Sequence, residues 1–113
     1  MILPGADRAF VDPRKVRKYL LSLDHPEGRD KARVFAGAGY SAGTWQLLAR
    51  QLRWLARFGL ARPGAESRFG WKYEVDGILQ GPSGDSLSVR TIWIVRHGQD
   101  FPRLVTAYPG RHR

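Results

Sequence analysis

The strand expected at the centre of the fold is residues 87–95, which read LSVRTIWIV. Alternate positions of this stretch carry residues that favour strands, and their side chains would share one face: Leu87, Val89, Thr91, Trp93 and Val95. Ile92 and Ile94 would lie on the opposite face. The pattern therefore predicts a long central strand whose middle is buried on both sides.

Shorter strand and turn patterns flank this central strand. Before it, residues 71–76 alternate aromatic or apolar with charged side chains, and the segment 81–85 has the proline and glycines of a turn. After it, residues 97–100 form another turn and residues 103–108 a further strand. The spacing predicts a twisted antiparallel sheet of three or more strands over about 68–109.

Helical patterns fill the first half of the chain. A first helix is expected from Pro13 to about Ser22, with Asp12 as its N-cap. A short helix is expected over 29–38. The longest is expected over 42–58, capped by Ser41, because its leucines recur at helical spacing.

The order of these patterns defines the fold class. A chain of 113 residues is one domain, residues 1–113, with room for one modest core. Its helical part covers about 12–58 and its sheet part about 68–109. We therefore expect an α+β domain in which two or three N-terminal helices pack on the sheet.

The charge of the chain favours a polyanionic partner. Nineteen Lys and Arg residues against ten Asp and Glu give a net charge of +9, and nucleic acid is the simplest partner for such a surplus. On the longest helix, Arg50, Arg53 and Arg57 form a stripe at i, i+3 and i+7. This stripe is either a solvated basic face or a strip that binds the phosphates of a substrate.

Several classes of site are not expected. There is no cysteine, and His25, His97 and His112 are too scattered for a metal cage, so we expect no metal and no cofactor. The segment after Met1 has no signal-peptide pattern, and the longest strongly apolar run, 92–95, is far too short for a membrane span. We therefore expect a cytoplasmic protein that does not enter a membrane.

The remaining residues suit phosphodiester chemistry without a metal, because RNA carries its own nucleophile in the 2′-hydroxyl. Such a site needs a base near neutral pKa, cations for the phosphate and donors for developing charge. The chain offers candidates for all three: His25, Lys31, Arg90, Arg103, Thr91, Thr106 and Tyr108. Each also has a structural interpretation, as a turn residue, an exposed helix cation, a strand former or a core ring.

Two segments resemble a little-characterised bacterial domain family. The first is KVRKYLL at 15–21 followed by the HPEG of 25–28 and by Lys31. The second is VRTIWIV at 89–95 followed by PRLVTAYP at 102–109. This family is similar to ribonuclease toxin domains of the barnase–EndoU–colicin–RelE group, and the resemblance covers nearly the whole chain.

The resemblance implies helices packed on a twisted antiparallel sheet, with an RNA site on the open sheet face. Lining residues would come from three places: the segment around His25 and Lys31, the Arg90–Thr91 pair, and the strand with Arg103, Thr106 and Tyr108. It also implies an RNA substrate such as tRNA, and an acidic antitoxin or immunity protein. The start at Met1 favours a free-standing toxin.

Within that site, His25 would be the general base or acid of a 2′-OH transesterification. Lys31 and Arg90 would bind the scissile phosphate, and Thr106 and Tyr108 would donate hydrogen bonds to it. Two alternatives stay open. One is a non-catalytic nucleic-acid-binding module, since an arginine-bearing helix followed by a hairpin is the order of a winged helix-turn-helix. The other is a protein-interaction domain of a bacterium or phage whose charge serves solubility.

Overall fold

The computed structural model describes residues 1–110, and its helices precede its strands. The helical elements are η1 (Ala6–Arg8), α1 (Pro13–Lys15), η2 (Val16–Leu20), α2 (Arg29–Gly37), η3 (Ala42–Thr44) and α3 (Trp45–Phe58). The strands are β1 (Ala61–Ser67), β2 (Gly70–Gln80), β3 (Ser86–Arg96) and β4 (Pro102–Pro109). Neighbouring strands pair antiparallel in the order β1-β2-β3-β4. The expected α+β fold is confirmed. Within residues 1–110, no helix is long and apolar enough to cross a membrane.

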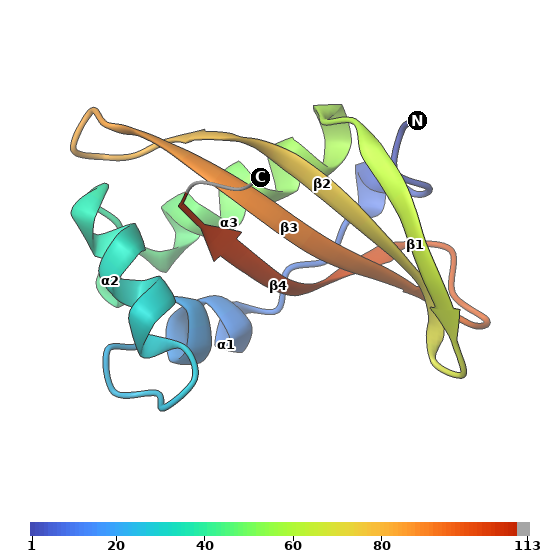
Figure 1. The fold of residues 1–113 in the computed structure, drawn as a ribbon, viewed down its shortest axis with the longest axis horizontal. Coiled ribbons are helices and arrows are strands. Elements are labelled where there is room, and N and C mark those ends of the chain that lie inside the picture. The colour runs from blue at the N-terminus through green and yellow to red at the C-terminus, as the bar shows by residue number, and fades with distance from the viewer. Residues whose placement is uncertain (111–113) are drawn as a thin grey trace.

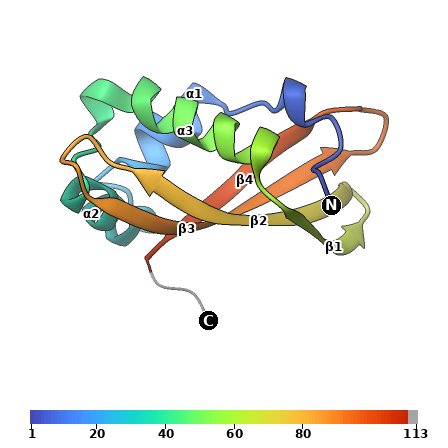
Figure 2. The same cartoon turned by 90° about the horizontal axis from the view of Figure 1, so that it is seen from above.

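The sheet has one covered and one uncovered face. In Figure 2, α3 runs across one face, and no helix of the described chain lies across the other. The elements α1 and α2 lie beside the β4 edge, near the C-terminal end of that strand (Figure 1). We call the uncovered face the open face; it carries Glu74 and Asp76 from β2 and Arg90, Ile92 and Ile94 from β3.

The central position of the stretch 87–95 is confirmed, because β3 pairs with β2 on one side and with β4 on the other. Val89, Thr91 and Trp93 are buried in the core beneath α3. Ile92 and Ile94 are only half-buried. The prediction that the middle of this strand is buried on both sides is therefore wrong, because the open face has no covering layer.

The first helix differs from its prediction in winding and length. The Asp12 carboxylate accepts the Arg14 N–H at 2.9 Å, as an N-cap does. The chain then widens into the π-helical turn η2, closed by the Leu21 N–H on the Val16 carbonyl at 2.9 Å. Helical winding ends at Leu20, two residues before the predicted end.

Two other boundaries also differ. The Ser41 hydroxyl contacts the Thr44 hydroxyl at 3.1 Å and caps no backbone N–H. A 3-10 turn therefore precedes α3, which begins at Trp45. The strand β1 lies in a segment expected to separate the helices from the sheet. Its first residue, Ala61, is buried and the next five are exposed, so the segment lacks the alternation by which a strand is recognised.

A β-bulge in β4 decides which of its side chains reach the open face. Thr106 pairs with Ile92, but Leu104 pairs with the very next residue of β3, Trp93. Val105 is therefore the extra residue of the bulge. Side chains alternate along a regular strand, and the extra residue lets Leu104 stay in the core while Thr106 turns to the open face.

The bulge brings the two ends of β4 onto one face. Without it, Arg103 would lie on the side of the sheet opposite to Thr106 and Tyr108. The Lys15 ammonium donates to the Val105 carbonyl at 2.8 Å, so α1 is anchored at the bulge. The same irregularity thus orients the strand and positions the first helix.

Gly28 allows α2 to approach the first helix closely. This glycine is buried, and a Cβ added to it would overlap the carbonyl oxygen of Tyr19. Gly28 has an ordinary negative φ of −92°, so the requirement is space and not backbone conformation. The close approach holds the start of α2, with Lys31, against Tyr19.

Replacing Gly28 with alanine should lower the free energy of unfolding by about 1–3 kcal/mol, the usual cost of overpacking a buried contact. The matched control is Gly37→Ala at the last residue of the same helix, where an added Cβ meets nothing within 4 Å. That change should be neutral or stabilising by up to ~1 kcal/mol, because alanine favours helix. Urea denaturation measures both, and equal stabilities for the two variants would contradict the packing argument.

Candidate active site on the open face

A group of polar and aromatic side chains surrounds Lys31 beside the β4 edge. The Lys31 ammonium donates to the Tyr19 hydroxyl and, at 3.2 Å, to the Thr106 hydroxyl. It lies 4.6 Å from the Tyr19 ring centroid and 4.8 Å from that of Tyr108. The His25 ring meets the Tyr19 ring edge-on, with centroids 5.0 Å apart. We call these five residues the Lys31 cluster; ring faces and hydroxyl oxygens both attract its positive charge.

The cluster joins parts of the chain that are far apart in sequence. Tyr19 comes from η2, Lys31 from the start of α2, and Thr106 and Tyr108 from β4 beyond the bulge. The buried Gly28 fixes the first two relative to each other. The bulge orients the other two, so the site depends on the packing of α1 and α2 against this one strand.

Opposing effects act on the pKa of Tyr19. Burial raises this pKa, but the hydrogen bonds from Lys31 and Thr106 and the charge of Lys31 favour the phenolate and outweigh it. The pKa of Tyr19 is therefore below its ordinary value. At Tyr40, in the core, burial acts without such partners and raises the pKa. The phenolate of Tyr19 is therefore more favoured in the Lys31 cluster than in a free tyrosine.

The His25 ring is held in one orientation by the backbone. Its Nδ1 accepts the N–H groups of Glu27 and Gly28, both at 3.0 Å. A neutral imidazole with an accepting Nδ1 carries its proton on Nε2. His25 therefore presents an N–H donor, while its accepting nitrogen is occupied. Its Nε2–H can therefore donate a hydrogen bond to a substrate oxygen, and the base or acid role of His25 stays a prediction.

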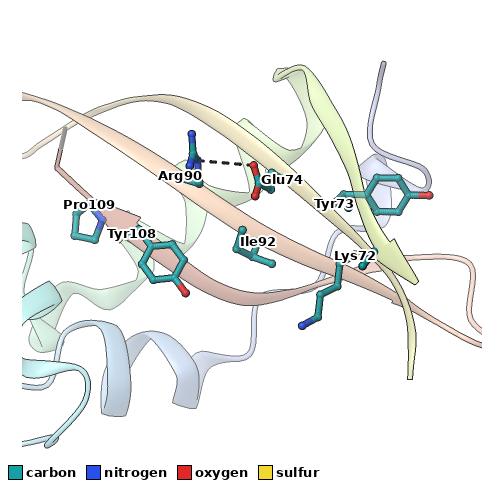
Figure 3. Close-up of a pocket in the computed structure, with 9 residues that line it drawn as sticks. Lys72, Tyr73, Glu74, Arg90, Ile92, Tyr108 and Pro109 are labelled. Atoms are coloured by element: carbon teal, nitrogen blue, oxygen red, sulfur yellow. Dashed lines mark ion pairs between the residues drawn. The ribbon is translucent and has the colours of Figure 1, made fainter. Parts of the chain in front are cut away.

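A pocket of about 710 Å³ opens on the sheet next to the Lys31 cluster. Figure 3 shows Arg90, Ile92, Tyr108 and Lys72 around it, with the Tyr73 ring pointing away. Tyr108 belongs to both the cluster and the pocket wall, and it pairs with Arg90 across the two strands. The pocket and the cluster therefore form one continuous surface.

Two carboxylates hold Arg90, which lines this pocket, and the neighbouring Arg62. Arg90 binds Asp76 through two parallel contacts, Nε to Oδ1 at 2.9 Å and Nη2 to Oδ2 at 3.2 Å. Its Nε is also 3.9 Å from Glu74 (Figure 3). Arg62 bridges Glu74 and Asp76 at 2.7 and 3.1 Å. The hydrogen bond from Arg90 lowers the pKa of Asp76 and, with the Arg62 contacts, outweighs its burial.

The structure places the other predicted site residues elsewhere. Thr91 is fully buried; its hydroxyl donates to the Val75 carbonyl at 2.7 Å and accepts the Trp93 indole N–H at 2.8 Å. We therefore assign Thr91 to the core, because a substrate on the open face cannot reach it. The structural interpretation of this residue is the one that fits its contacts.

Arg103 shares the open face but not the cluster. It pairs with Ile94, four residues along β3 from the partner of Tyr108, a distance of about 13 Å at ~3.3 Å per residue. Its guanidinium lies 5.0 Å from the Phe10 ring centroid and 5.1 Å from that of Phe101. Arg103 therefore suits a more distant part of a substrate.

The arginine stripe of the long helix lies on the outer surface of α3, away from the sheet: Arg50, Arg53 and Arg57. This placement keeps the stripe apart from the open face.

Among residues 1–110, no group of three or more His, Asp or Glu side chains is arranged to hold a metal ion. His97, in the turn after β3, contacts the carbonyl of Ser67 at the end of β1 at 3.0 Å, and His112 lies outside the described residues.

Two parts of the site were missed by sequence reasoning. Tyr19 was not chosen as a site residue, although a tyrosine hydroxyl inside a folded domain needs a hydrogen-bond partner and that need is itself a signal. Glu74 and Asp76 were not recognised as a pair, although alternate positions of a strand share a face. The position of Arg90 opposite Asp76 follows only from the register of the hairpin.

Comparison with known proteins places the chain in a fold class and a family. A chain from the contact-dependent growth inhibition toxin–immunity protein complex of Klebsiella pneumoniae 342 superimposes with a TM-score of 0.66, 16% identity, and coverage of 88% of this chain and 97% of that chain. The two chains share an α+β fold. The chain belongs to the family described as a domain of unknown function (DUF6883), which matches residues 2–111. No curated protein matches it.

Replacing Lys31 with methionine should raise the pKa of Tyr19, because the change removes the charge and the hydrogen bond that favour the phenolate and leaves the burial that opposes it. Carbon-13 NMR titration of the tyrosine Cζ signals measures this directly. In the unchanged protein Tyr19 should titrate below about 10. The exposed Lys18→Met is the matched control and should leave that titration unchanged; a shift of the same size in both variants would refute the local cause.

Replacing Asp76 with asparagine should strengthen binding of single-stranded nucleic acid, because Arg90 and Arg62 lose the carboxylate that partly neutralises them. One additional phosphate contact would steepen the slope of log K against log salt concentration by about 0.7. Fluorescence anisotropy with a labelled oligonucleotide at several salt concentrations measures the slope. The control Asp30→Asn removes the same charge from α2, and an identical effect there would show that only net charge matters.

Proposed function

We propose that the protein is a metal-independent endoribonuclease toxin that cleaves tRNA or another cellular RNA by 2′-OH transesterification. The observation that carries this proposal is the Lys31 cluster: a half-buried ammonium joined to a tyrosine hydroxyl of lowered pKa, beside a pocket with Arg90. The shared fold with a chain of a toxin–immunity protein complex and the net charge of +9 support it.

The reaction needs no cofactor to supply its nucleophile. The 2′-oxygen attacks the adjacent phosphorus, the new O2′–P bond forms and the P–O5′ bond breaks. One proton leaves the 2′-hydroxyl and one proton is delivered to the departing 5′-oxygen. The products are a 2′,3′-cyclic phosphate and a 5′-hydroxyl. The protein must move these two protons and stabilise the negative charge that gathers on the phosphate in the transition state.

The residues of the site divide these tasks. Tyr19, as the phenolate beside Lys31, takes the proton of the 2′-hydroxyl. The Lys31 ammonium gives a proton to the 5′-oxygen, and the Tyr19 phenol then passes the proton it took to Lys31 through their hydrogen bond. The Nε2–H of His25 donates a hydrogen bond to the phosphate. The ammonium of Lys31 and the guanidinium of Arg90 oppose the charge on the non-bridging oxygens, and Tyr108 donates a hydrogen bond to them. The Thr106 hydroxyl donates to Tyr19 and stabilises its phenolate.

A toxin of this kind needs a partner that keeps it inactive in the cell that makes it. We propose an acidic antitoxin or immunity protein, because complementary charge steers association with a +9 domain. Covering the pocket beside Tyr108 would be sufficient, since that surface connects the phosphate-binding cations to the Lys31 cluster. A second candidate function is a non-catalytic nucleic-acid-binding domain, favoured by the net charge of +9 and by the exposed Arg50, Arg53 and Arg57 of α3.

Incubation of the purified protein with total bacterial RNA in EDTA tests the proposal. The unchanged protein should cut RNA and leave 2′,3′-cyclic phosphate ends. Tyr19→Phe and Lys31→Met should each lose roughly 10²–10⁴-fold in rate, the usual scale for a proton-transfer group. His25→Ala should lose roughly 10²–10³-fold, the scale for a donor that stabilises transition-state charge. Lys18→Met, an exposed charge in the same helical segment, is the control and should retain the full rate.

Two outcomes would overturn the assignment. If the unchanged protein leaves RNA intact but binds it with an affinity that falls steeply as the salt concentration rises, the non-catalytic candidate is favoured. Full activity in both His25→Ala and Lys31→Met would show that any cleavage takes place at another site.

A further inference from the structure

The outer surface of α3 carries a group of residues that the proposed active site does not use. Arginines recur there at i, i+3 and i+7. Two large aromatic side chains lie between and beside them, and 60% of the tryptophan and 57% of the phenylalanine is exposed. We call this group the α3 strip: Arg50, Arg53, Trp54, Arg57 and Phe58. It borders a pocket of about 270 Å³ whose other wall is formed by η1.

The positive charge of the α3 strip is not neutralised within the described chain. Ion pairs hold five other arginines of the protein: Arg8, Arg14, Arg33, Arg62 and Arg90. No ion pair joins any arginine of the strip to an acid among residues 1–110. Asp7, which lines the neighbouring pocket, is itself 3.8 Å from Arg8. The strip therefore presents three positive charges along about 10 Å of helix, at ~1.5 Å per residue.

The aromatic part of the strip offers a surface for stacking. The rings of Trp54 and Phe58 pack with centroids 5.2 Å apart at 50°, and the Arg57 guanidinium lies 5.2 Å from the Phe58 ring centroid. Rings held in this way need little ordering when a ligand binds. Exposed aromatic rings interleaved with cations are the features by which proteins bind single-stranded nucleic acid, through its phosphates and the faces of its bases.

The strip is separated from the open face by the core. The opposite side of α3 is buried against the sheet through Leu48, Leu52 and Leu55, and the open face lies beyond the sheet (Figure 2). A phosphate bound at the Lys31 cluster therefore cannot also contact the strip. If the strip binds the same nucleic acid, it binds a different part of the strand.

We propose that the α3 strip is a second nucleic-acid site, which holds phosphates and a stacked base of a single strand independently of the open face. It rests on the proposed function only in that RNA would be the natural ligand. A strand reaching both sites must pass around a body with short extents of 26 × 25 Å, which a strand of only a few nucleotides cannot do. Long RNA would use both sites and short RNA only one.

The test uses a labelled 24-nucleotide oligodeoxythymidine, which lacks the 2′-hydroxyl and so cannot be cleaved by the proposed chemistry. Its binding is followed by fluorescence anisotropy from low to moderate salt. The variant with Arg50, Arg53 and Arg57 changed to glutamine should flatten the slope of log K against log salt concentration by about 2, at ~0.7 per phosphate. Trp54→Ala should weaken binding about tenfold through loss of stacking.

The matched control changes the same number of charges. Arg8, Arg14 and Arg33 are exposed but ion-paired, and their replacement by glutamine should flatten the slope far less. Equal effects of the two triple variants, or an unchanged slope in the α3 variant, would overturn the proposal and leave the strip to a protein partner. Circular dichroism of each variant establishes that it is folded.

The same variants separate this proposal from the proposed function. If RNA is cut, the α3 triple variant should raise KM for a 24-nucleotide RNA several-fold, leave kcat unchanged, and leave cleavage of a 6-nucleotide RNA unchanged. A protein that binds the deoxy strand through α3 but never cuts RNA would refute the nuclease and support the second site. If the protein cuts RNA but the α3 triple variant binds the deoxy strand as tightly as the unchanged protein does, the nuclease is supported and the second site is refuted.

Discussion

The site on this molecule depends on one irregularity in β4, the extra residue Val105. A half-buried ammonium such as that of Lys31 needs oxygen partners close by, since leaving it without them costs several kcal/mol. The bulge supplies one of them by turning Thr106 away from the core. The Lys15 side chain then binds the carbonyl of the bulged residue itself. The strand, the first helix and the lysine are therefore mutually dependent, and none of the three takes its place alone.

The sequence was informative where one residue pattern had one physical solution. The alternation in 87–95 required a central strand, and the leucine spacing before Gly59 required a helix. The strand β1 was not recognised, because its exposed edge position leaves no alternation to read. The bulge was not predictable, because Val105 is as good a strand residue as its neighbours and only the paired register reveals the insertion.

The candidate site was partly predictable for a similar reason. His25, Lys31, Thr106 and Tyr108 were chosen for their chemistry, and the fold brings them together. Thr91 was chosen on the same grounds and lies in the core, since neighbouring residues of a strand point to opposite faces. Tyr19 was overlooked because its ring satisfies the apolar face of a helix, whereas its hydroxyl serves another purpose. Tyrosine has an apolar ring and a polar hydroxyl, and hydrophobic periodicity detects only the ring.

The placement of positive charge on both sides of the apolar layer has a consequence for inhibition. A protein that plugs the hollow beside Tyr108 would shield one side of the molecule and leave the guanidinium groups of α3 facing solvent. Blocking the open face would then not abolish the attraction of the protein to polyanions. If both proposals hold, an inhibited complex would remain concentrated on nucleic acid in the cell and would act there once its inhibitor departs.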